Sequence, residues 1–323
     1  MAQQDIVLTH VEGTQARVSP ARGMNCYQLL VPAGKRSVSV LWAEPEFAAG
    51  RGRPSASGVP VLFPFPGRMQ GNRLRWRGRE FSFPYEDGQG NAIHGLALQR
   101  PWQVVDQQAD CLRGRFRASE HLPGWQQHWP CDFELELFFQ LLPRGLQLQA
   151  TVRNPDREEL PWGLGLHPYF ALPLGEKGSA ESCRLYVPAA AQVPLEKMIP
   201  TGNLLRGSGT SAELLARNQP LEDRVLDDVL TELHPDPQHW EAAITDPENN
   251  LRVRIVAQGF PHAVVYTPPH RQAVCVEPYS CIPGVFNRVL EGTWQGRFDP
   301  GVRFLPPGQE TRMQMTLLVE EVA

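Results

Sequence analysis

The chain has 323 residues, 31 basic and 35 acidic side chains, and a formal net charge of −4. This length allows a sizeable core, and the charge gives no reason to expect nucleic acid or an anionic membrane as a partner. No apolar run is long enough to span a bilayer, and the first residues lack the basic-then-apolar order of a signal peptide. We therefore expect a cytoplasmic protein whose six scattered cysteines are buried thiols.

Prolines and glycines punctuate the chain in a rhythm typical of many strands joined by turns. Apolar residues alternate with polar ones in several segments, which predicts strands with one buried side: Cys131–Leu141, Leu146–Val152, Leu251–Val256 and Met313–Val319. Only Thr210–Ala216 predicts a short helix. We therefore expect an all-β fold, a large antiparallel β-sandwich of two packed sheets. No linker or repeat divides the chain, so residues 1–323 are predicted to form a single domain.

The first stretch that carries chemistry is Gly58–Phe83, a strand that runs into a proline-rich turn and then a hairpin. The hairpin is predicted to turn near Arg77 and Gly78. Arg68, Asn72 and Arg73 stand where the preceding turn could present them to a ligand. The alternative is that they are ordinary surface residues, because turns collect such residues anyway.

Two histidines stand in bends. In Gly90–Trp102, glycines lie close to His94, and they allow the backbone to line a groove. In Trp162–Leu172, His167 precedes a proline, which biases it away from helix, and Tyr169 can provide an aromatic wall. A polar group held among aromatic walls suits a small-molecule site, although a lone histidine is often only a structural, hydrogen-bonded residue.

Two further stretches carry carboxylates. Asp227 and Asp228 are adjacent in the apolar segment Leu226–Leu233, so only one of them can point inward if the segment is extended. Glu277 ends a short apolar strand in Ala273–Asn287. A buried carboxylate is costly unless it is paired, so its surroundings are expected to raise its pKa or give it a firm partner, as a general base requires.

Together these stretches resemble the aldose 1-epimerase (galactose mutarotase) family. The order of short motifs is the one that the family shows: GR-x-x-NR, N-A-x-HG, HPYF, D-D-x-x-T-x-L, and VEPY with a nearby FN, which together run from Gly67 to Asn287. The resemblance implies a large antiparallel β-sandwich with a sugar site in an open cleft on one sheet. It also implies catalysis without a metal or an organic cofactor.

The resemblance further implies roles for the candidate residues. Glu277 would be the general base and His167 the general acid. His94 would bind the ring oxygen or a neighbouring hydroxyl. The expected substrate-binding residues are Arg68, Asn72, Arg73, Tyr169 and one of Asp227 and Asp228. The family's spacing favours Asp227, but Leu230 stands where an aromatic residue is usual, so the choice between the two acids stays open. Trp162 and Tyr279 are further candidates for aromatic walls.

These residue types suit mutarotation, in which a base and an acid open and reclose a sugar ring. A non-catalytic sugar-binding protein on the same fold is one alternative, although it would need no acid and base together. A metal-dependent hydrolase that uses His94, His167 and an acid as ligands is another, but the chain shows no close ligand spacing.

The expected substrate is a free hexose, with a hexose 6-phosphate as the alternative. A phosphate would need cations around it, and four arginines crowd one hairpin: Arg73, Arg75, Arg77 and Arg79. The same alternation also fits a solvated face. The oligomeric state cannot be read from the sequence.

Overall fold

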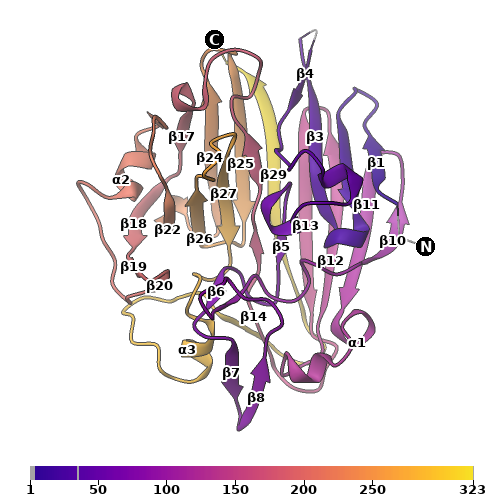
Figure 1. Ribbon diagram of the computed structural model, residues 1–323, viewed down its shortest axis with the longest axis vertical. Helices are drawn as coiled ribbons and strands as arrows, with labels where there is room; N and C mark the ends of the chain where they lie inside the picture. The colour runs from indigo at the N-terminus through magenta and orange to yellow at the C-terminus, as the bar shows by residue number, and fades with distance from the viewer. Residues whose placement is uncertain (1–3, 35, 323) are drawn as a thin grey trace.

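The computed structural model describes residues 4–34 and 36–322, and its sheets are built of antiparallel strands, with few helices (Figure 1). The largest sheet has ten strands, in the order β10 (Gln103–Gln107), β11 (Cys111–Arg117), β12 (Glu134–Leu142), β13 (Gly145–Arg153), β29 (Glu310–Glu321), β25 (Leu251–Gln258), β24 (His239–Asp246), β17 (Arg184–Tyr186) and β21 (Gln219–Pro220), with β23 (Pro235–Asp236) beside β24. The four segments predicted from alternation all lie in this sheet.

A second sheet of seven strands carries the features that matter for function. Its order is β18 (Ala189–Val193), β22 (Asp227–Leu233), β26 (His262–Tyr266), β27 (Ala273–Tyr279), β15 (Gly165–Leu166) and β5 (Val61–Leu62), and β16 (Tyr169–Ala171) also pairs with β27. Buried side chains of both sheets, such as Val253 of β25 and Val276 of β27, belong to one hydrophobic core. The predicted β-sandwich is therefore confirmed.

Smaller sheets complete the fold. Four N-terminal strands pair in sequence order: β1 (Ile6–Thr9), β2 (Gln15–Ser19), β3 (Asn25–Ala33) and β4 (Arg36–Ser39). Four two-stranded pairs follow: β6 (Arg68–Met69) with β9 (Ala92–Ile93), β7 (Arg73–Trp76) with β8 (Arg79–Ser82), β14 (Leu160–Trp162) with β28 (Arg303–Leu305), and β19 (Leu195–Glu196) with β20 (Ile199–Pro200). The β7–β8 hairpin turns at Arg77 and Gly78, as predicted, and both residues have positive φ.

The α-helices are short: α1 (Ala118–His121), α2 (Ser211–Ala216) and α3 (Phe286–Leu290). The predicted short helix is α2, which begins after Thr210 because the Thr210 hydroxyl accepts a hydrogen bond from the backbone N–H of Glu213. Within the described part of the chain, no helix has both the length and the apolar character needed to cross a membrane. All six cysteines lie in that part, and each is a free, buried thiol, as expected.

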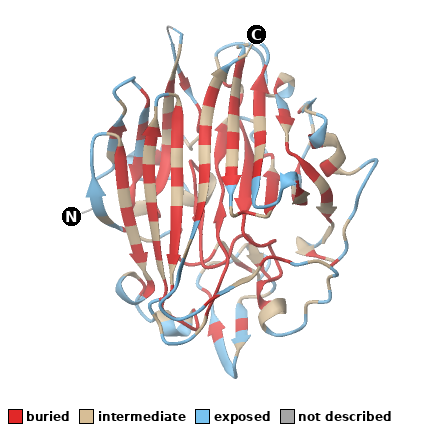
Figure 2. Ribbon diagram, turned by 180° about the vertical axis from the view of Figure 1, so that it is seen from behind, coloured by how far each residue is buried: buried red, intermediate tan, exposed pale blue. Residues whose placement is uncertain are grey.

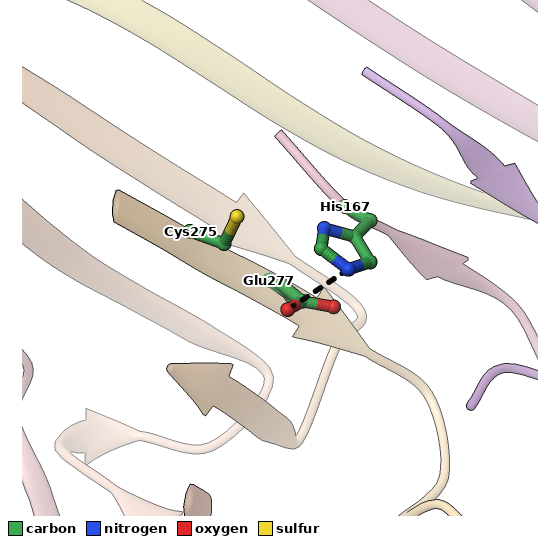
Figure 3. Close-up of side chains that lie close together, drawn as sticks. All are labelled: His167, Cys275 and Glu277. Carbon is green, nitrogen blue, oxygen red and sulfur yellow. Dashed lines mark ion pairs between the residues drawn. The ribbon is translucent and has the colours of Figure 1, made fainter. Parts of the chain in front are cut away.

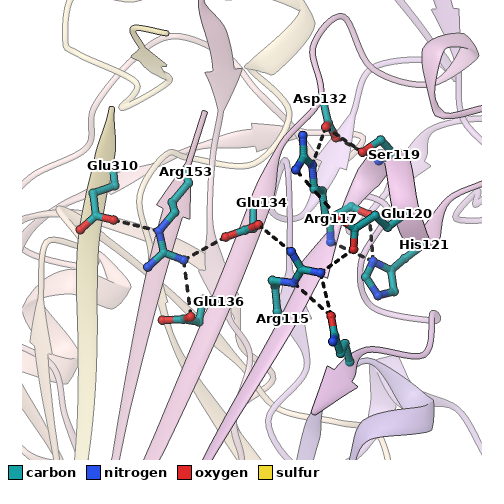
Figure 4. Close-up of polar contacts among 11 residues, drawn as sticks. Arg115, Arg117, Ser119, Glu120, His121, Asp132, Glu134, Glu136, Arg153 and Glu310 are labelled. Carbon is teal, nitrogen blue, oxygen red and sulfur yellow. Dashed lines mark hydrogen bonds and ion pairs between the residues drawn. The ribbon is translucent and has the colours of Figure 1, made fainter. Parts of the chain in front are cut away.

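The ten-stranded sheet has one buried face and one polar face. Along β12 every second residue is buried, and Figure 2 shows the same alternation across the neighbouring strands. The outward residues of this face form a network of ion pairs (Figure 4). Arg153 contacts Glu134 at 2.9 Å and Glu310 at 2.8 Å, and Arg115 contacts Glu134 at 3.3 Å. This face is therefore the solvated one, and the opposite face packs on the core.

Candidate functional site

A cleft of about 700 Å³ lies on the seven-stranded sheet. Its lining comes from segments that are far apart in the sequence. The side chains that matter most for the chemistry are Arg68, His94, His167, Asp227, Glu277 and Tyr279. The structure thus brings His94, His167 and Glu277 into one lining, together with three of the expected substrate-binding residues: Arg68, Tyr169 and Asp227.

Glu277 lies on β27, a strand buried along its whole length. Because side chains alternate along a strand, Cys275, Glu277 and Tyr279 point to one face. Val274 and Val276 point the other way and pack in the main core. The alternation therefore places the Glu277 carboxylate in the cleft while its neighbours in sequence anchor the strand.

His167 lies between β15 and β16, both of which pair with β27. Its backbone N–H donates to the carbonyl oxygen of Pro60 at 3.0 Å, which fixes the bend before Pro168. The imidazole stacks on the Tyr169 ring, with ring centroids 4.7 Å apart and planes 5° apart. As a result its Nε2 lies 3.3 Å from Oε1 of Glu277 (Figure 3).

Burial sets the protonation of this pair. It raises the pKa of Glu277 well above its usual range, although a hydrogen bond from the Tyr279 hydroxyl to Oε2, 2.8 Å long, acts in the opposite direction. Burial, and then repulsion from His94, lower the pKa of His167 well below its usual value. Desolvation therefore favours the uncharged forms of both groups, a protonated carboxyl and a neutral imidazole.

His94 follows β9 and has a φ of 63°. Its backbone N–H donates to the carbonyl oxygen of Gly67 at 2.8 Å. Gly95 allows this bend, because a Cβ at that position would lie 2.2 Å from the carbonyl oxygen of Phe63. The His94 and His167 rings are 5.8 Å apart and nearly perpendicular. Desolvation, followed by the nearby Arg68 guanidinium, lowers the pKa of His94 to about 3, so this imidazole is neutral.

The two histidines share one unusual feature. The Nδ1 atom of each is buried, and neither finds a hydrogen-bond partner among the described residues. Buried polar atoms are normally paired, and exceptions occur where a ligand completes the pairing. This supports a site that binds a polar molecule.

Arg68 and Asp227 also line the cleft. The Nε of Arg68 lies 3.0 Å from Oδ2 of Asp87, which holds the guanidinium in place. Asp227 and Asp228 follow one another on β22, so they point to opposite faces. Asp227 lines the cleft, whereas Asp228 accepts hydrogen bonds from Gln192 at 2.6 Å and Ser211 at 2.9 Å. Asp227 is therefore the acid of the pair that lines this cleft.

Three of the expected residues lie elsewhere. Within the described chain, neither Arg73 nor Asn72 lines the cleft. Arg73 lies on the β7–β8 hairpin and pairs with Glu80 at 2.6 Å, because the hairpin carries the strand away from the sheet. Asn72 donates a hydrogen bond to Glu86, whose side chain does line the cleft. Trp162, a candidate wall, is buried beside Phe63 instead.

Sequence reasoning missed several lining residues. Tyr279 was expected only as an aromatic wall, although its spacing of two from Glu277 could have indicated a hydrogen-bond donor. Tyr266 lies edge-on to His167, with centroids 6.3 Å apart, and Trp42 lines the cleft beside Tyr169. Neither belongs to a recognisable motif.

One cluster in the described chain has donors typical of metal sites. Ligand atoms of His167, Cys275 and Glu277 all lie within 4.8 Å of one another (Figure 3). However, burial raises the pKa of the Cys275 thiol well above its usual value. A metal at this position would need the Cys275 thiolate, and its binding would have to offset the burial that disfavours that charged form.

Comparison with known proteins agrees with this architecture. A family model described as aldose 1-epimerase matches residues 4–317. The uncharacterised Escherichia coli protein YihR is 25% identical over 240 residues, which cover 72% of each chain. A galactose mutarotase-like protein from Clostridium acetobutylicum superposes with a TM-score of 0.82 at 22% identity, covering 96% of this chain and 94% of that one.

A second solved structure shows the same fold. The GalM/aldose epimerase homologue from C. elegans superposes with a TM-score of 0.79 at 15% identity, and the match covers 99% of both chains. At these identities the structural likeness establishes the fold alone, whereas the family model spans nearly the whole sequence. The chain belongs to the aldose 1-epimerase family.

Proposed function

We propose that this protein interconverts the α and β anomers of an unphosphorylated aldose by opening and reclosing its ring. The observation that carries the proposal is the 3.3 Å contact between His167 Nε2 and Glu277 Oε1 in a cleft lined by polar and aromatic side chains. An acid and a base in one small site are what this reaction requires.

In this mechanism Glu277 accepts the proton of the anomeric hydroxyl while His167 donates a proton to the ring oxygen. The C1–ring oxygen bond breaks, its electron pair goes to the ring oxygen, and C1 becomes the carbonyl carbon of the open aldehyde. After rotation about the C1–C2 bond the proton transfers reverse and the ring recloses. Neither group is consumed, so the pair ends each turnover with the single proton that it held at the start.

Substrate binding prepares the pair for this step. In the empty site burial favours a neutral carboxyl and a neutral imidazole. Sugar hydroxyls that donate hydrogen bonds to Glu277 favour its carboxylate form, as does the nearby Arg68. The shared proton then moves to Nε2 of His167, which donates it to the ring oxygen. Neutral His94 adds a hydrogen bond to the ring oxygen or a neighbouring hydroxyl.

The charges of the cleft favour an unphosphorylated sugar. Its described lining contains two guanidinium groups, from Arg53 and Arg68, and, besides Glu277, four acidic side chains, from Glu44, Glu86, Asp87 and Asp227. A phosphate dianion would be repelled by this excess of acids. The hairpin arginines do not compensate, because Arg73 and Arg75 pair with Glu80, and Arg77 with Glu158.

Polarimetry on freshly dissolved α-anomers tests the proposal, with the spontaneous rate subtracted. The protein is expected to accelerate the relaxation of glucose or galactose and to have little effect on glucose 6-phosphate. Acceleration confined to the phosphate would overturn the substrate assignment. No acceleration of any aldose would favour a sugar-binding protein without catalytic activity.

A further inference from the structure

The cleft extends beyond the groups that serve the reaction. On the side of His167 its lining continues through Tyr169 to a second group of residues, Trp42, Glu44, Arg53, Ser55 and His270. The chemistry proposed above uses none of these five side chains. They come from three segments of the chain that converge at this end of the cleft and together form one surface.

Trp42 is held rigidly at the centre of this surface. Its indole stacks on the His270 ring, with centroids 4.1 Å apart and planes 21° apart. The indole N–H donates to Oε1 of Gln272 at 3.2 Å, and the backbone N–H donates to the carbonyl oxygen of Tyr169 at 2.8 Å. The side chain is only partly buried. A preorganised, partly exposed indole offers contact area with little further loss of entropy on binding.

The polar groups beside Trp42 carry charges that balance, and hydrogen bonds hold their backbone in place. Glu44 accepts a hydrogen bond from the backbone N–H of Arg53 at 2.8 Å, and its other oxygen lies 3.8 Å from the Arg53 Nε. The carbonyl oxygen of Ser55 accepts a hydrogen bond from the Tyr169 hydroxyl at 2.9 Å. The segment is anchored below by Asn25, which donates to the carbonyl oxygen of Ser57 at 2.8 Å.

The reaction fixes which part of the sugar points toward Trp42. His167 serves the ring oxygen, and C5, with C6 attached to it, is bonded to that oxygen. The C5–C6 side of the sugar therefore lies toward His167. The aromatic rings continue in this direction, because Tyr169 stacks on His167 at 4.7 Å and Trp42 lies 6.2 Å beyond Tyr169.

We propose that Trp42, with Glu44 and Arg53 beside it, forms a second sugar-binding subsite. It takes a glycosyl residue attached to the C6 side of the reacting sugar, so the substrates include reducing disaccharides. This orientation of the sugar, and with it the proposal, rests on the proposed function. An aromatic face bordered by a carboxylate and a guanidinium suits a neutral ring with many hydroxyls, which need both donors and acceptors. A phosphate dianion at this surface would meet only one cation, the Arg53 guanidinium.

Titration calorimetry on the full chain tests the subsite independently of turnover. The ligands are glucose, isomaltose and glucose 6-phosphate. Isomaltose is expected to bind about threefold to tenfold more tightly than glucose, the scale of one aromatic contact. Trp42→Ala should abolish this preference and leave glucose binding unchanged. Trp76→Ala is the matched control, because Trp76 is also half-buried but lies on the β7–β8 hairpin, and it should keep the preference.

Several results would overturn the subsite. They are equal affinity for glucose and isomaltose, a preference that survives in Trp42→Ala, tightest binding of glucose 6-phosphate, or no binding of any sugar. Should Trp42→Ala fail to fold, His270→Ala removes the exposed ring that supports the indole and is expected to weaken the preference. Polarimetry on the same samples separates the two proposals: Trp42-dependent binding without accelerated mutarotation would refute the proposed function and leave the subsite standing.

Discussion

His167 Nε2 lies 3.3 Å from Glu277 Oε1, although the two residues are far apart in the sequence. The contact exists because the strands on either side of His167, β15 and β16, both pair with β27. The pairing of these strands thus sets the distance between the two side chains. Burial of the pair then raises the pKa of Glu277 and lowers the pKa of His167.

Asp227 and Asp228 provide a matched pair of substitutions. Asp227→Asn should raise the Michaelis constant for the sugar about tenfold, because a carboxylate that accepts hydroxyl hydrogen bonds is lost from the cleft. Asp228→Asn should leave the kinetics unchanged and lower the unfolding temperature, because Asp228 holds Ser211 at the start of α2. Steady-state polarimetry and thermal unfolding of both variants check this. The opposite pattern would mean that Asp228 serves the sugar.

The ionisation of Glu277 is expected to reduce stability at high pH. Its pKa is raised in the folded protein, so the folded state holds the proton more tightly than the unfolded chain does. The resulting stabilisation is fully present below the unfolded pKa of about 4.3 and is lost as the pH rises through the folded pKa. Glu277→Gln cannot ionise. The unfolding temperature of Glu277→Gln minus that of the parent should therefore be larger at pH 8 than at pH 4.5. An equal difference at both pH values would contradict the raised pKa of Glu277.

His94 is expected to contribute through one hydrogen bond from a neutral imidazole. Asparagine tolerates a positive φ and retains a donor, so His94→Asn should fold normally. Loss of a donor placed for the transition state typically lowers kcat by about 10²-fold. Because Asn is shorter than His, we expect a loss of that order with little change in the unfolding temperature. Full activity in a folded His94→Asn variant would remove His94 from the mechanism.

Arg68 and Arg73 should differ sharply when replaced by alanine. Burial raises the pKa values of Glu277 and Asp227, and Arg68, which lines the same cleft, acts against this shift. Arg68→Ala should therefore reduce kcat/KM for a free aldose by about tenfold or more. Arg73 is exposed and pairs with Glu80, so Arg73→Ala should have no effect on free or phosphorylated sugars. A selective loss with glucose 6-phosphate in Arg73→Ala would revive the phosphate hypothesis.

The fold was predictable because its signal is local. Alternation along β12, β13, β25 and β29 shows directly which face is buried, and the turn at Arg77 and Gly78 is encoded by two adjacent residues. The sequence also indicated that Asp227 and Asp228 point to opposite faces of a strand. It could not show which face of β22 lines the cleft. That depends on the pairing of β22 with β26, a long-range property.

The site was predictable only where motifs mark it. The surroundings of Glu277 and His167 were identified by their strand ends and bends. Trp42 and Tyr266 carry no such mark, because their place in the cleft depends on how distant segments meet. Arg73 looked equivalent to Arg68 in sequence, yet the β7–β8 hairpin carries it away. The roles of these side chains in catalysis, and the single domain over residues 1–323, stay predictions.

The central claim is that Glu277 and His167 act as an acid–base pair on a bound sugar. The most direct test is polarimetry on freshly dissolved α-glucose or α-galactose with the parent protein and Glu277→Gln. Glutamine keeps the shape of the side chain and can still contact a hydroxyl, but it cannot accept the proton. We predict a kcat at least about 10²-fold lower with a nearly unchanged Michaelis constant. A Gln variant that relaxes the anomers as fast as the parent would contradict the account.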